Sequence, residues 1–546
     1  MDYNKLADIL FCDVTKTPED YNALYPARNL PESAEVTRIA PSPTGFIHLG
    51  NLFGALADER IAKLSDGVFY LRIEDTDEKR KVEGAVEAVL DSLGYFGLKF
   101  DEGAEIGGNY GPYYQRQRAD LYRTFAKELV KKGLAYPCFC TEEELSAVRE
   151  IQQENKENTG YWGKYAKCRN LSLEEIERKI SEGAPYVLRL RSPGNVENKF
   201  TFEDEIKGKI TVCENDLDIV ILKRDGIPTY HFAHVIDDHF MGTTLVVRGE
   251  EWVATLPIHL QLFELLGFER PKYAHTAQLM KIDNGKKRKL SKRHDPELSL
   301  EYYKSLGYHP TAVKTYLMTL LNSNFEEWFL ANPEKPLEEF EFSVSKMGQS
   351  GALFDTMKLD DISKTVISNM EADDVLSFYE NWVKEYASDD YDVIFADKAF
   401  IKKIIELQMA IGSKKRRKDF ICAKQMHGLF GYYFTQYFKP TYDFKLDSEM
   451  SRTILEKFIA VYNIADDNET WFNKVKEIAS ELGFAVKMGD YKKNPDAYKG
   501  FVGDVAEIIR VAVTGIKNTP DLCTIMQIIG EDESRKRIAD AINHLS

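Results

Sequence analysis

The chain has 546 residues, of which 43% are hydrophobic and 29% are charged, a composition that fits an ordinary globular protein and excludes a disordered or fibrous one. Its net charge of −16 counts against a non-specific nucleic-acid binder, although RNA could still bind to a local basic surface. No apolar run approaches the roughly 18 residues that a membrane-spanning helix needs.

The length predicts about three to five domains of roughly 100 to 200 residues each. The first residues, Met1 to Lys5, lack the basic and then apolar layout of an export signal. Seven cysteines, an odd number scattered over a long chain, favour reduced thiols. We therefore expect a cytoplasmic protein.

The first functional pattern follows an N-terminal stretch of 34 residues that contains a short predicted helix around Leu6 to Phe11. A predicted strand at residue 38 leads into the loop Pro41-Ser42-Pro43-Thr44-Gly45, and His48-Leu49-Gly50-Asn51 then opens an amphipathic helix. The first N–H groups of a helix lack partners within it and favour negative charge, so a phosphate would be stable there. His48 would add a donor, and the glycines would let a nucleotide approach the backbone. The alternative is that His48 only caps the helix and the glycines only make a turn.

Strands and helices alternate from residue 38 to about 132. Val68 to Ile73 is a predicted strand, and Asp75-Thr76-Asp77 offers candidate N-caps for the helix that follows. This alternation predicts a parallel, doubly wound sheet with ligands at the carboxyl ends of its strands.

An insertion is predicted from about Tyr136 to Cys213, where charged helices interrupted by prolines replace the alternating pattern. It carries Cys138-Phe139-Cys140 and, further on, Cys168-Arg169-Asn170. Three thiolates could hold a metal with an unseen fourth ligand, but Asn170 is a poor zinc ligand.

The sheet is expected to resume after the insertion. Its predicted members are the stretches Leu217 to Lys223, Thr229 to His231 and Leu245 to Arg248, followed by a helix from Pro257 to Leu266. The nearby Asp237, Asp238 and His239 have no second set of ligands at suitable spacing, so we expect them to make structural hydrogen bonds and not to bind a metal.

A basic loop, Lys286 to Arg293, follows a strand-like run from Tyr273 to Met280. Basic loops are usually only solvated. In a chain that is acidic overall, however, a compact cationic cluster suits a triphosphate tail.

Helical periodicity dominates from about residue 376 to the end, with few strand signals. The run Lys414 to Lys418 is the best candidate there for contact with RNA phosphates, and a solvated loop is an equal alternative.

The order of these motifs resembles that of class I aminoacyl-tRNA synthetases, specifically the bacterial-type glutamyl-tRNA synthetase family. The resemblance rests on Pro41 to Gly45, His48 to Asn51, Arg72-Ile73-Glu74-Asp75-Thr76-Asp77 and Lys289-Leu290-Ser291-Lys292-Arg293. It is clear from about Arg38 to Lys358 and thinner beyond. In the family the counterpart of Arg38 lies close to the start, so the N-terminal extension is a departure.

The resemblance implies an α/β fold. It consists of a Rossmann-like doubly wound parallel sheet, an inserted α+β acceptor-binding domain and an all-helical anticodon-binding region. The expected parts are an N-terminal extension (1–34), the two catalytic halves (35–135 and 215–299), the insertion (136–214), a stem-contact linking domain (300–375) and the helical region (376–546).

The implied activity is that of a glutamate-tRNA ligase acting as a monomer. L-glutamate would be activated by ATP to glutamyl-adenylate and transferred to the 3′ end of tRNA(Glu), with Mg²⁺ accompanying ATP. His48, Lys289 and Lys292 would be catalytic, because they would stabilise the phosphates as pyrophosphate leaves. The full implied ATP-binding set is Gly45, His48, Gly50, Asn51, Lys289, Ser291 and Lys292.

The resemblance also implies a glutamate pocket. Glu74 would take the α-ammonium group, and Arg38 and Arg248 would hold carboxylate oxygens and discriminate against glutamine. The alternative is that Glu74 and Arg248 form an ordinary ion pair. The implied pocket consists of Arg38, Ala40, Ser42, Glu74, Tyr230, His234 and Arg248, with His234 standing where asparagine is common.

Two further expectations concern the insertion and the tRNA terminus. Some members of the family bind zinc in the insertion with Cys-x-Cys and Cys-x-His, but Asn170 replaces the histidine here, and we expect no bound zinc. Asp77 and Arg80 follow the glutamate-binding strand and are candidates for contact with the terminal ribose of tRNA.

Three rival functions remain for comparison. A glutaminyl-tRNA synthetase shares the loop types, but a pair of arginines for carboxylates speaks against it. A tRNA-modifying glutamyl ligase would lack the long helical end. A non-catalytic tRNA-binding paralogue would be expected to lose His48, Lys289 or Lys292, and all three are present.

Overall fold

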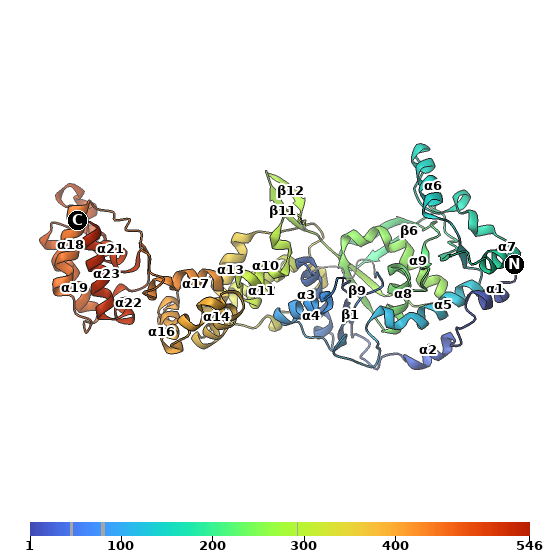
Figure 1. Cartoon of the computed structure of the whole chain (residues 1–546), viewed down its shortest axis with the longest axis horizontal. Helices are drawn as coiled ribbons and strands as arrows, with labels where there is room; N and C mark the ends of the chain where they lie inside the picture. The colour runs from blue at the N-terminus through green and yellow to red at the C-terminus, as the bar shows by residue number, and fades with distance from the viewer. Residues whose placement is uncertain (44–46, 78–81, 292, 546) are drawn as a thin grey trace. The chain divides into compact units, whose positions relative to one another are not determined.

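The computed structural model describes residues 1–43, 47–77, 82–291 and 293–545 (Figure 1). The chain forms two compact units. The first comprises Met1–Tyr303 and Val313–Thr356, and the second comprises Lys304–Ala312 and Met357–Ser546. In the part of the chain described, no helix is both long enough and apolar enough to cross a bilayer.

Short parallel strands form the centre of the first unit. They are β1 (Val36–Ile39), β2 (Val68–Leu71), β3 (Glu102–Gly103), β9 (Leu245–Gly249) and β10 (Lys272–Thr276). The N–H of Thr244, directly before β9, donates to the carbonyl oxygen of Val36 at 3.0 Å, which places β9 beside β1. The strand order is therefore β3-β2-β1-β9-β10, and it reverses between β1 and β9. The predicted parallel, doubly wound α/β sheet is confirmed.

Helices cover both faces of this sheet. Adjacent residues of β1 point to opposite faces. The Thr37 hydroxyl donates to the backbone oxygen of Asp58 in α3 (Leu49–Leu64) at 2.8 Å. The side chain of Arg38 instead reaches Asp238 in α8 (Tyr230–Phe240), so α3 and α8 lie on opposite sides.

Two local predictions in the sheet region are wrong. The helix after β2 is α4 (Ala85–Tyr95), and its N-cap is Gly84 at φ 75°, while the carboxylate of Asp75 accepts from the backbone N–H of Arg116 at 2.9 Å. Residues 229–231 are not a strand, because Thr229 is the N-cap of α8. The apolar residues that follow are spaced for a helix: Phe232, Ala233, Val235 and Ile236 are all buried.

The segment after α5 (Ala119–Lys131) forms a separate antiparallel sheet. Its strands are β4 (Ala135–Cys138), β5 (Val187–Leu190) and β8 (Val220–Leu222). The parallel sheet therefore does not resume at residues 217–223 as predicted, because β8 pairs with β5. The same segment carries α6 (Glu142–Glu154), α7 (Leu173–Ser181) and the hairpin of β6 (Lys199–Asp204) and β7 (Gly208–Cys213).

The N-terminal residues pack into the core of the first unit. The short helix predicted around Leu6 is present as α1 (Tyr3–Leu10), and α2 (Pro18–Leu24) follows it. Leu6, Leu10 and Phe11 are buried in the same cluster as Phe125 of α5. Burial of side chains of this size is worth about 1.5 to 3 kcal/mol each, so the extension stabilises the fold.

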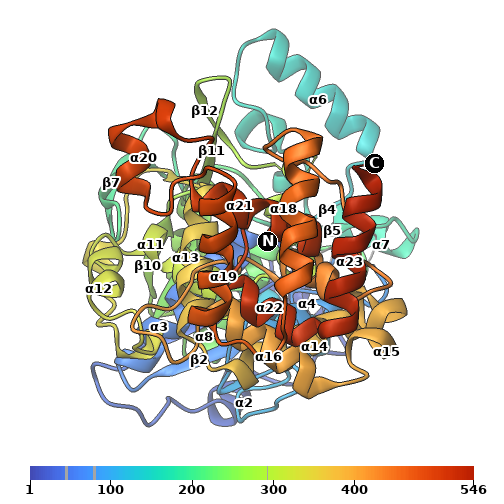
Figure 2. The same cartoon turned by 90° about the vertical axis from the view of Figure 1, so that its left-hand side faces the viewer.

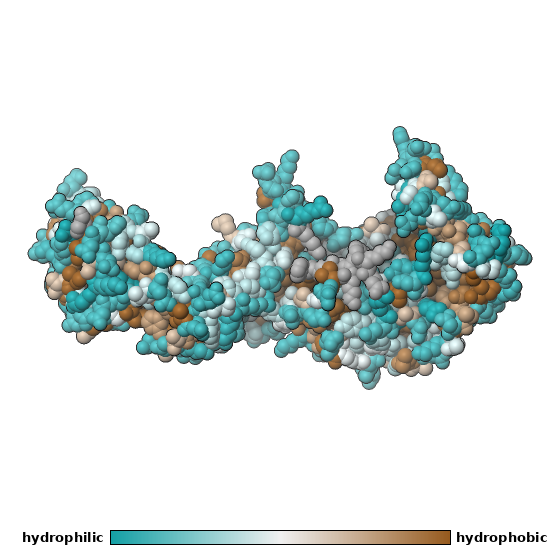
Figure 3. Space-filling view, viewed as in Figure 1, coloured by the Kyte–Doolittle hydropathy of each residue, from teal (hydrophilic) through white to brown (hydrophobic). Residues whose placement is uncertain are grey.

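A two-stranded hairpin follows the second half of the sheet. After α9 (Leu256–Leu266) and β10, the chain forms β11 (Leu279–Asp283) and β12 (Lys286–Lys289), so the first part of the predicted basic loop is a strand. The hairpin projects from the helices of its own unit in Figure 1, and its tip can be found beside the label β12 in Figure 2. Its exposed end is mainly hydrophilic (Figure 3). Short elements follow: α10 (Leu300–Leu306), α11 (Pro310–Leu321), α12 (Phe325–Ala331) and β13 (Ala352–Leu353), which pairs with β11.

The second unit is helical, as expected for the end of the chain. Its helices are α13 (Thr356–Asn369), α14 (Ala372–Tyr386), α15 (Tyr391–Ile394), α16 (Lys398–Met409), α17 (Ala423–Phe430), α18 (Ser448–Val461), α19 (Asn468–Glu481), α20 (Met488–Lys493), α21 (Val502–Thr514), α22 (Leu522–Ile529) and α23 (Glu531–His544). Two apolar cores hold them, one around Tyr379 and Ile404 and the other around Phe458 and Ile508.

The basic run in this unit is partly engaged within the fold. Arg416 donates to the carbonyl oxygens of Ser368 and Met370 at the end of α13, at 3.1 and 2.6 Å. Arg417 pairs with Asp419 at 2.6 Å. These arginines therefore have structural partners, and contact of the run with RNA phosphates stays a prediction.

Candidate active site

A large cleft opens where the strand order of the parallel sheet reverses, beyond the carboxyl ends of β1 and β9. Open α/β sheets bind ligands at this position. The cavity has a volume of about 1580 Å³. Pockets for one small ligand usually measure about 300 to 1,000 Å³, so this cleft has room for more than one substrate.

Most of the predicted site residues line this single cleft, although they come from distant parts of the sequence. They are Arg38, Ala40, Ser42, His48, Gly50, Asn51, Glu74, Tyr230, Arg248, Lys289 and Ser291, and Asp77 also lines it. Gly45, Arg80 and Lys292 lie outside the described residues. The imidazole of His234 is fully buried and stacks on Tyr230 at 5.8 Å between ring centroids, so it lies behind the cleft wall.

The start of α3 brings His48 to the cleft. His48 is the N-cap residue, and its backbone N–H donates to the side-chain oxygen of Asn51 at 3.1 Å. Its backbone also forms a β-bridge with Ser299, which follows the basic loop. A Cβ atom at Gly50 would lie 3.0 Å from Nδ1 of His48, which is tighter than ordinary contact, so any other residue there would push the ring by a few tenths of an ångström.

Arg288 in the β11–β12 hairpin holds the basic loop in place. In the sequence, this arginine belongs to the cationic cluster that is predicted to bind phosphates. The guanidinium of Arg288 makes two hydrogen bonds to the buried carboxylate of Asp295, at 2.6 and 2.8 Å, and lowers its pKa. Asp295 also accepts from the backbone N–H of Ser291 at 2.8 Å. Arg288 thus shapes the loop, while Lys289 and Ser291 line the cleft. No local pattern identifies Asp295 as its partner.

A buried ionic network supports the acidic side of the cleft. Arg72 is fully buried and donates to Glu74 at 3.1 Å and to Asp238 at 2.6 Å. Arg38 reaches Asp238 at 3.4 Å. Burial opposes ionisation of Asp238, but Arg38 and Arg72 outweigh it and hold the pKa of this carboxyl well below its usual value. Burial raises the pKa of Glu74 despite both arginines.

The predicted structural role of the acidic residues in α8 is confirmed. Asp237 accepts hydrogen bonds from Gln115, Arg118 and Tyr122 at 2.7 to 2.9 Å. His239 stacks on Phe268 at 3.7 Å between ring centroids.

Arg248 occupies a different environment, made of histidines. Its Nη1 lies 3.1 Å from Nδ1 of His259, and its Nε–H donates to Nε2 of His275 at 3.0 Å. Its Nη2 is buried without a hydrogen-bond partner among the described residues. The alternative of an ion pair with Glu74 is not what the structure shows, because Glu74 pairs with Arg72. Sequence reasoning missed both histidines, since neither belongs to a motif.

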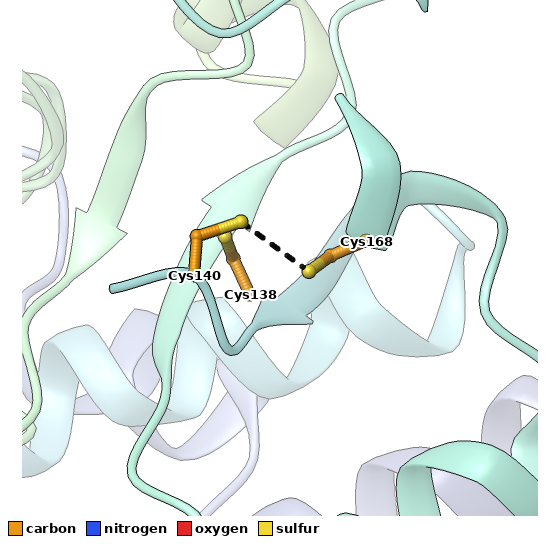
Figure 4. A group of neighbouring side chains, drawn as sticks. All are labelled: Cys138, Cys140 and Cys168. Carbon is orange, nitrogen blue, oxygen red and sulfur yellow. Dashed lines mark hydrogen bonds between the residues drawn. The ribbon is translucent and has the colours of Figure 1, made fainter. Parts of the chain in front are cut away.

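The insertion brings its three cysteines together (Figure 4). Their sulfur atoms lie within 4.8 Å of one another, and all three side chains are buried. Hydrogen bonds from the neighbouring thiols lower the pKa of Cys138. The hydroxyl of Tyr161 lies 3.3 Å from the sulfur of Cys140. Buried, converging thiols fit three ligands of a tetrahedral zinc ion.

Comparison with known proteins gives results over nearly the whole chain. The family model for the catalytic domain of class I tRNA synthetases (E and Q) matches residues 35–361, and a model for an anticodon binding domain matches residues 499–542. Glutamate-tRNA ligase of Acetivibrio thermocellus is 54% identical over 98% of this chain and 99% of the relative. The enzyme of that name from Clostridium perfringens strain 13 is 48% identical over 98% and 100%. A solved glutamate tRNA ligase from Elizabethkingia meningosepticum, in complex with its amino acid, has a TM-score of 0.75 and 28% identity over 94% of this chain and 100% of that chain.

Proposed function

This chain belongs to the glutamate-tRNA ligases of the class I tRNA synthetase family, and we propose that its cleft joins L-glutamate to tRNA(Glu) in two steps driven by ATP. One observation carries the proposal. His48 and Asn51 line the same cavity as Lys289 and Ser291, some 240 residues later in the sequence, and Arg248 also lines this cavity. Cationic groups and helix-start amides suit the phosphates, and a guanidinium suits a carboxylate.

In the first step, a carboxylate oxygen of glutamate attacks the α-phosphorus of ATP, and the bond to the bridging oxygen of the β-phosphate breaks. Pyrophosphate leaves with that electron pair. His48 and the amides of α3 would stabilise charge on the α-phosphate, and Lys289 with Lys292 would hold the departing phosphates. Mg²⁺ that accompanies ATP would neutralise part of the same charge.

Glutamate would be held between the two walls of the cleft. Arg248 lines the cleft, and no carboxylate of the described residues pairs with its guanidinium, so a substrate carboxylate could do so. Glu74 would accept from the α-ammonium group, and Arg38 would contribute to a carboxylate site. Glutamine carries an uncharged amide, so it would satisfy a guanidinium less well.

In the second step, a hydroxyl of the terminal ribose of tRNA attacks the glutamyl carbonyl, and AMP leaves. Of the two candidates for contact with that ribose, Asp77 lines the cleft, and Arg80 lies outside the described residues. The insertion (136–214) would hold the acceptor end, residues 300–375 the stem, and the helices of 376–546 the anticodon. We propose that the enzyme acts as a monomer in the cytoplasm.

Zinc, which some members of the family bind, would be held in this chain by Cys138, Cys140 and Cys168. Bound there, it would fasten strand β4 to the 3-10 helix that contains Cys168 and so stabilise the insertion. The ion supplies no step of the reaction.

Aminoacylation with labelled amino acids tests the proposal. The purified chain is incubated with ATP, Mg²⁺ and separately purified glutamate and glutamine tRNAs. We expect charging of tRNA(Glu) with glutamate and none with glutamine, and loss of charging in Lys289→Ala. The matched control is Lys287→Ala, an exposed lysine of the same strand that does not line the cleft. Charging with glutamine alone would instead indicate a glutaminyl-tRNA synthetase.

A further inference from the structure

The side chain of Arg248 is held from behind by two imidazoles. It donates through Nε to His275 at 3.0 Å and contacts Nδ1 of His259 through Nη1 at 3.1 Å. A guanidinium has donors only, so each contacting imidazole nitrogen must present a lone pair. Both histidines must therefore be neutral, and burial, which lowers the pKa of each, supports this state.

The tautomer of His275 is fixed from its other side. Since Nε2 accepts from Arg248, the ring proton must lie on Nδ1. That nitrogen is 2.6 Å from a carboxylate oxygen, Oδ2 of Asp204, and both side chains are fully or almost fully buried. A carboxylate accepts this proton and cannot donate one, so Asp204 selects the tautomer that Arg248 needs.

Asp204 is itself fixed by backbone amides. Its other oxygen, Oδ1, accepts from the N–H groups of Ile206, Lys207 and His275 at 3.1, 2.9 and 3.2 Å. Burial opposes ionisation of Asp204, but the hydrogen bonds from His275 and the backbone outweigh it and lower its pKa. Asp204 is the last residue of β6, so it comes from the inserted hairpin and not from the sheet that carries Arg248.

We propose that Asp204 and His275 are positioning residues for the amino-acid substrate. Asp204 holds His275 in one tautomer, and His275 holds the guanidinium of Arg248 at the wall of the cleft, where it would meet the substrate carboxylate. The inference deepens the proposed function and rests on it. It also gives the inserted domain a part in amino-acid recognition, through a side chain that touches no substrate.

The variant Asp204→Asn tests the relay because the backbone dictates how its amide sits. The three backbone N–H groups keep the amide oxygen at the position of Oδ1, so the NH₂ group faces Nδ1 of His275. That imidazole nitrogen must then accept, the ring proton moves to Nε2, and it opposes the Nε–H of Arg248. We expect the KM for glutamate to rise about tenfold, the usual effect of losing one charge-assisted hydrogen bond. The KM for ATP should stay within about twofold of wild type.

The control is Asp390→Asn in the second unit, which alters another carboxylate–imidazole pair, with His427 at 3.1 Å. KM does not depend on the fraction of folded enzyme, so partial unfolding of a variant does not mimic the effect. Unchanged glutamate KM in Asp204→Asn, or equal rises in both variants, would overturn the inference. If Asp204→Asn yields no folded protein, the same criterion is applied to His275→Phe.

A double-mutant cycle checks that Asp204 acts through His275. In the His275→Phe background, Asp204→Asn should raise the glutamate KM no further. Additive rises would show that Asp204 acts independently and would overturn the relay. A wild-type chain that fails to charge tRNA with glutamate overturns the proposed function as well, whereas normal wild-type charging beside an unchanged Asp204→Asn variant overturns the relay alone.

Discussion

Arginines on the two sides of the cleft are held by opposite means. Arg72 is buried against two carboxylates, those of Asp238 and Glu74. Arg248 is held by neutral imidazoles, and within the described residues no carboxylate pairs with it. The charge of Arg72 is compensated inside the protein, whereas the charge of Arg248 remains available to a substrate. The difference teaches that a buried arginine indicates a substrate site only when its charge is not already compensated.

Replacing Arg72 should remove the positive charge that two buried carboxylates share, and we expect the largest loss of stability from this substitution. In Arg72→Met, the buried carboxylates of Asp238 and Glu74 lose their shared partner. Loss of one partner of a buried pair costs about 3 to 5 kcal/mol in the free energy of unfolding. Urea denaturation followed by circular dichroism measures it. Unfolding within about 1 kcal/mol of wild type would mean that this network does not hold the fold.

Replacing Arg248 should have the converse effect, a large loss of activity with a smaller loss of stability. In Arg248→Ala, kcat/KM for glutamate should fall about 10² to 10³-fold, since a charged hydrogen-bond donor to the substrate is lost. The free energy of unfolding should fall by about 1 to 3 kcal/mol, less than in Arg72→Met, because two buried imidazoles lose a donor but no buried carboxylate loses a partner. Steady-state charging and urea denaturation check the two halves. A variant that is unstable but normally active when folded would contradict the distinction.

A substitution at Gly50 tests whether the reaction of ATP depends on the position of the His48 ring. In Gly50→Ala, the new Cβ would displace His48, and we expect kcat to fall about tenfold while the glutamate KM stays unchanged. Gly94→Ala in α4, where a Cβ meets no atom within 4 Å, is the matched control and should keep full activity. Equal kcat values for the two variants would show that the position of His48 does not limit the reaction.

Acid should lower the stability of the fold through His231 and His234, because burial lowers the pKa of each to about 4. The unfolded chain binds protons on these rings below about pH 6.5, whereas the folded chain does so only near pH 4. Stability is therefore full above about pH 6.5 and is lost as pH falls toward 4. In His234→Asn the slope of unfolding free energy with pH should flatten by up to about 1.4 kcal/mol per pH unit. Identical slopes in the variant and wild type, from urea titrations between pH 4 and 7, would contradict this.

The parallel sheet and the residues of the cleft could be predicted from the sequence better than the buried residues that hold the cleft side chains in place. Strand and helix alternation is local, so the doubly wound sheet could be predicted, and the motifs identified Arg38, Glu74 and Arg248. Their partners could not be found in this way. Asp238 lies 200 residues from Arg38, and Asp204 lies 71 residues from His275.

Errors in the predicted elements have a related cause. The stretch around Tyr230 contains too few residues to distinguish a strand from the first turn of a helix. The sequence predicts that residues 217–223 continue the parallel sheet, but an apolar pattern does not reveal which neighbour a strand pairs with, and β8 pairs with β5. Pairing between strands is decided by the fold as a whole.

Equilibrium binding to two variants tests most directly that one cleft holds two substrates on opposite walls. Equilibrium dialysis with labelled glutamate and, separately, labelled ATP is carried out on wild type, Arg248→Ala and Lys289→Ala. We predict that Arg248→Ala weakens glutamate binding about 100-fold and leaves ATP binding unchanged, and that Lys289→Ala weakens only ATP binding. Wild-type affinity for glutamate in Arg248→Ala would contradict the account.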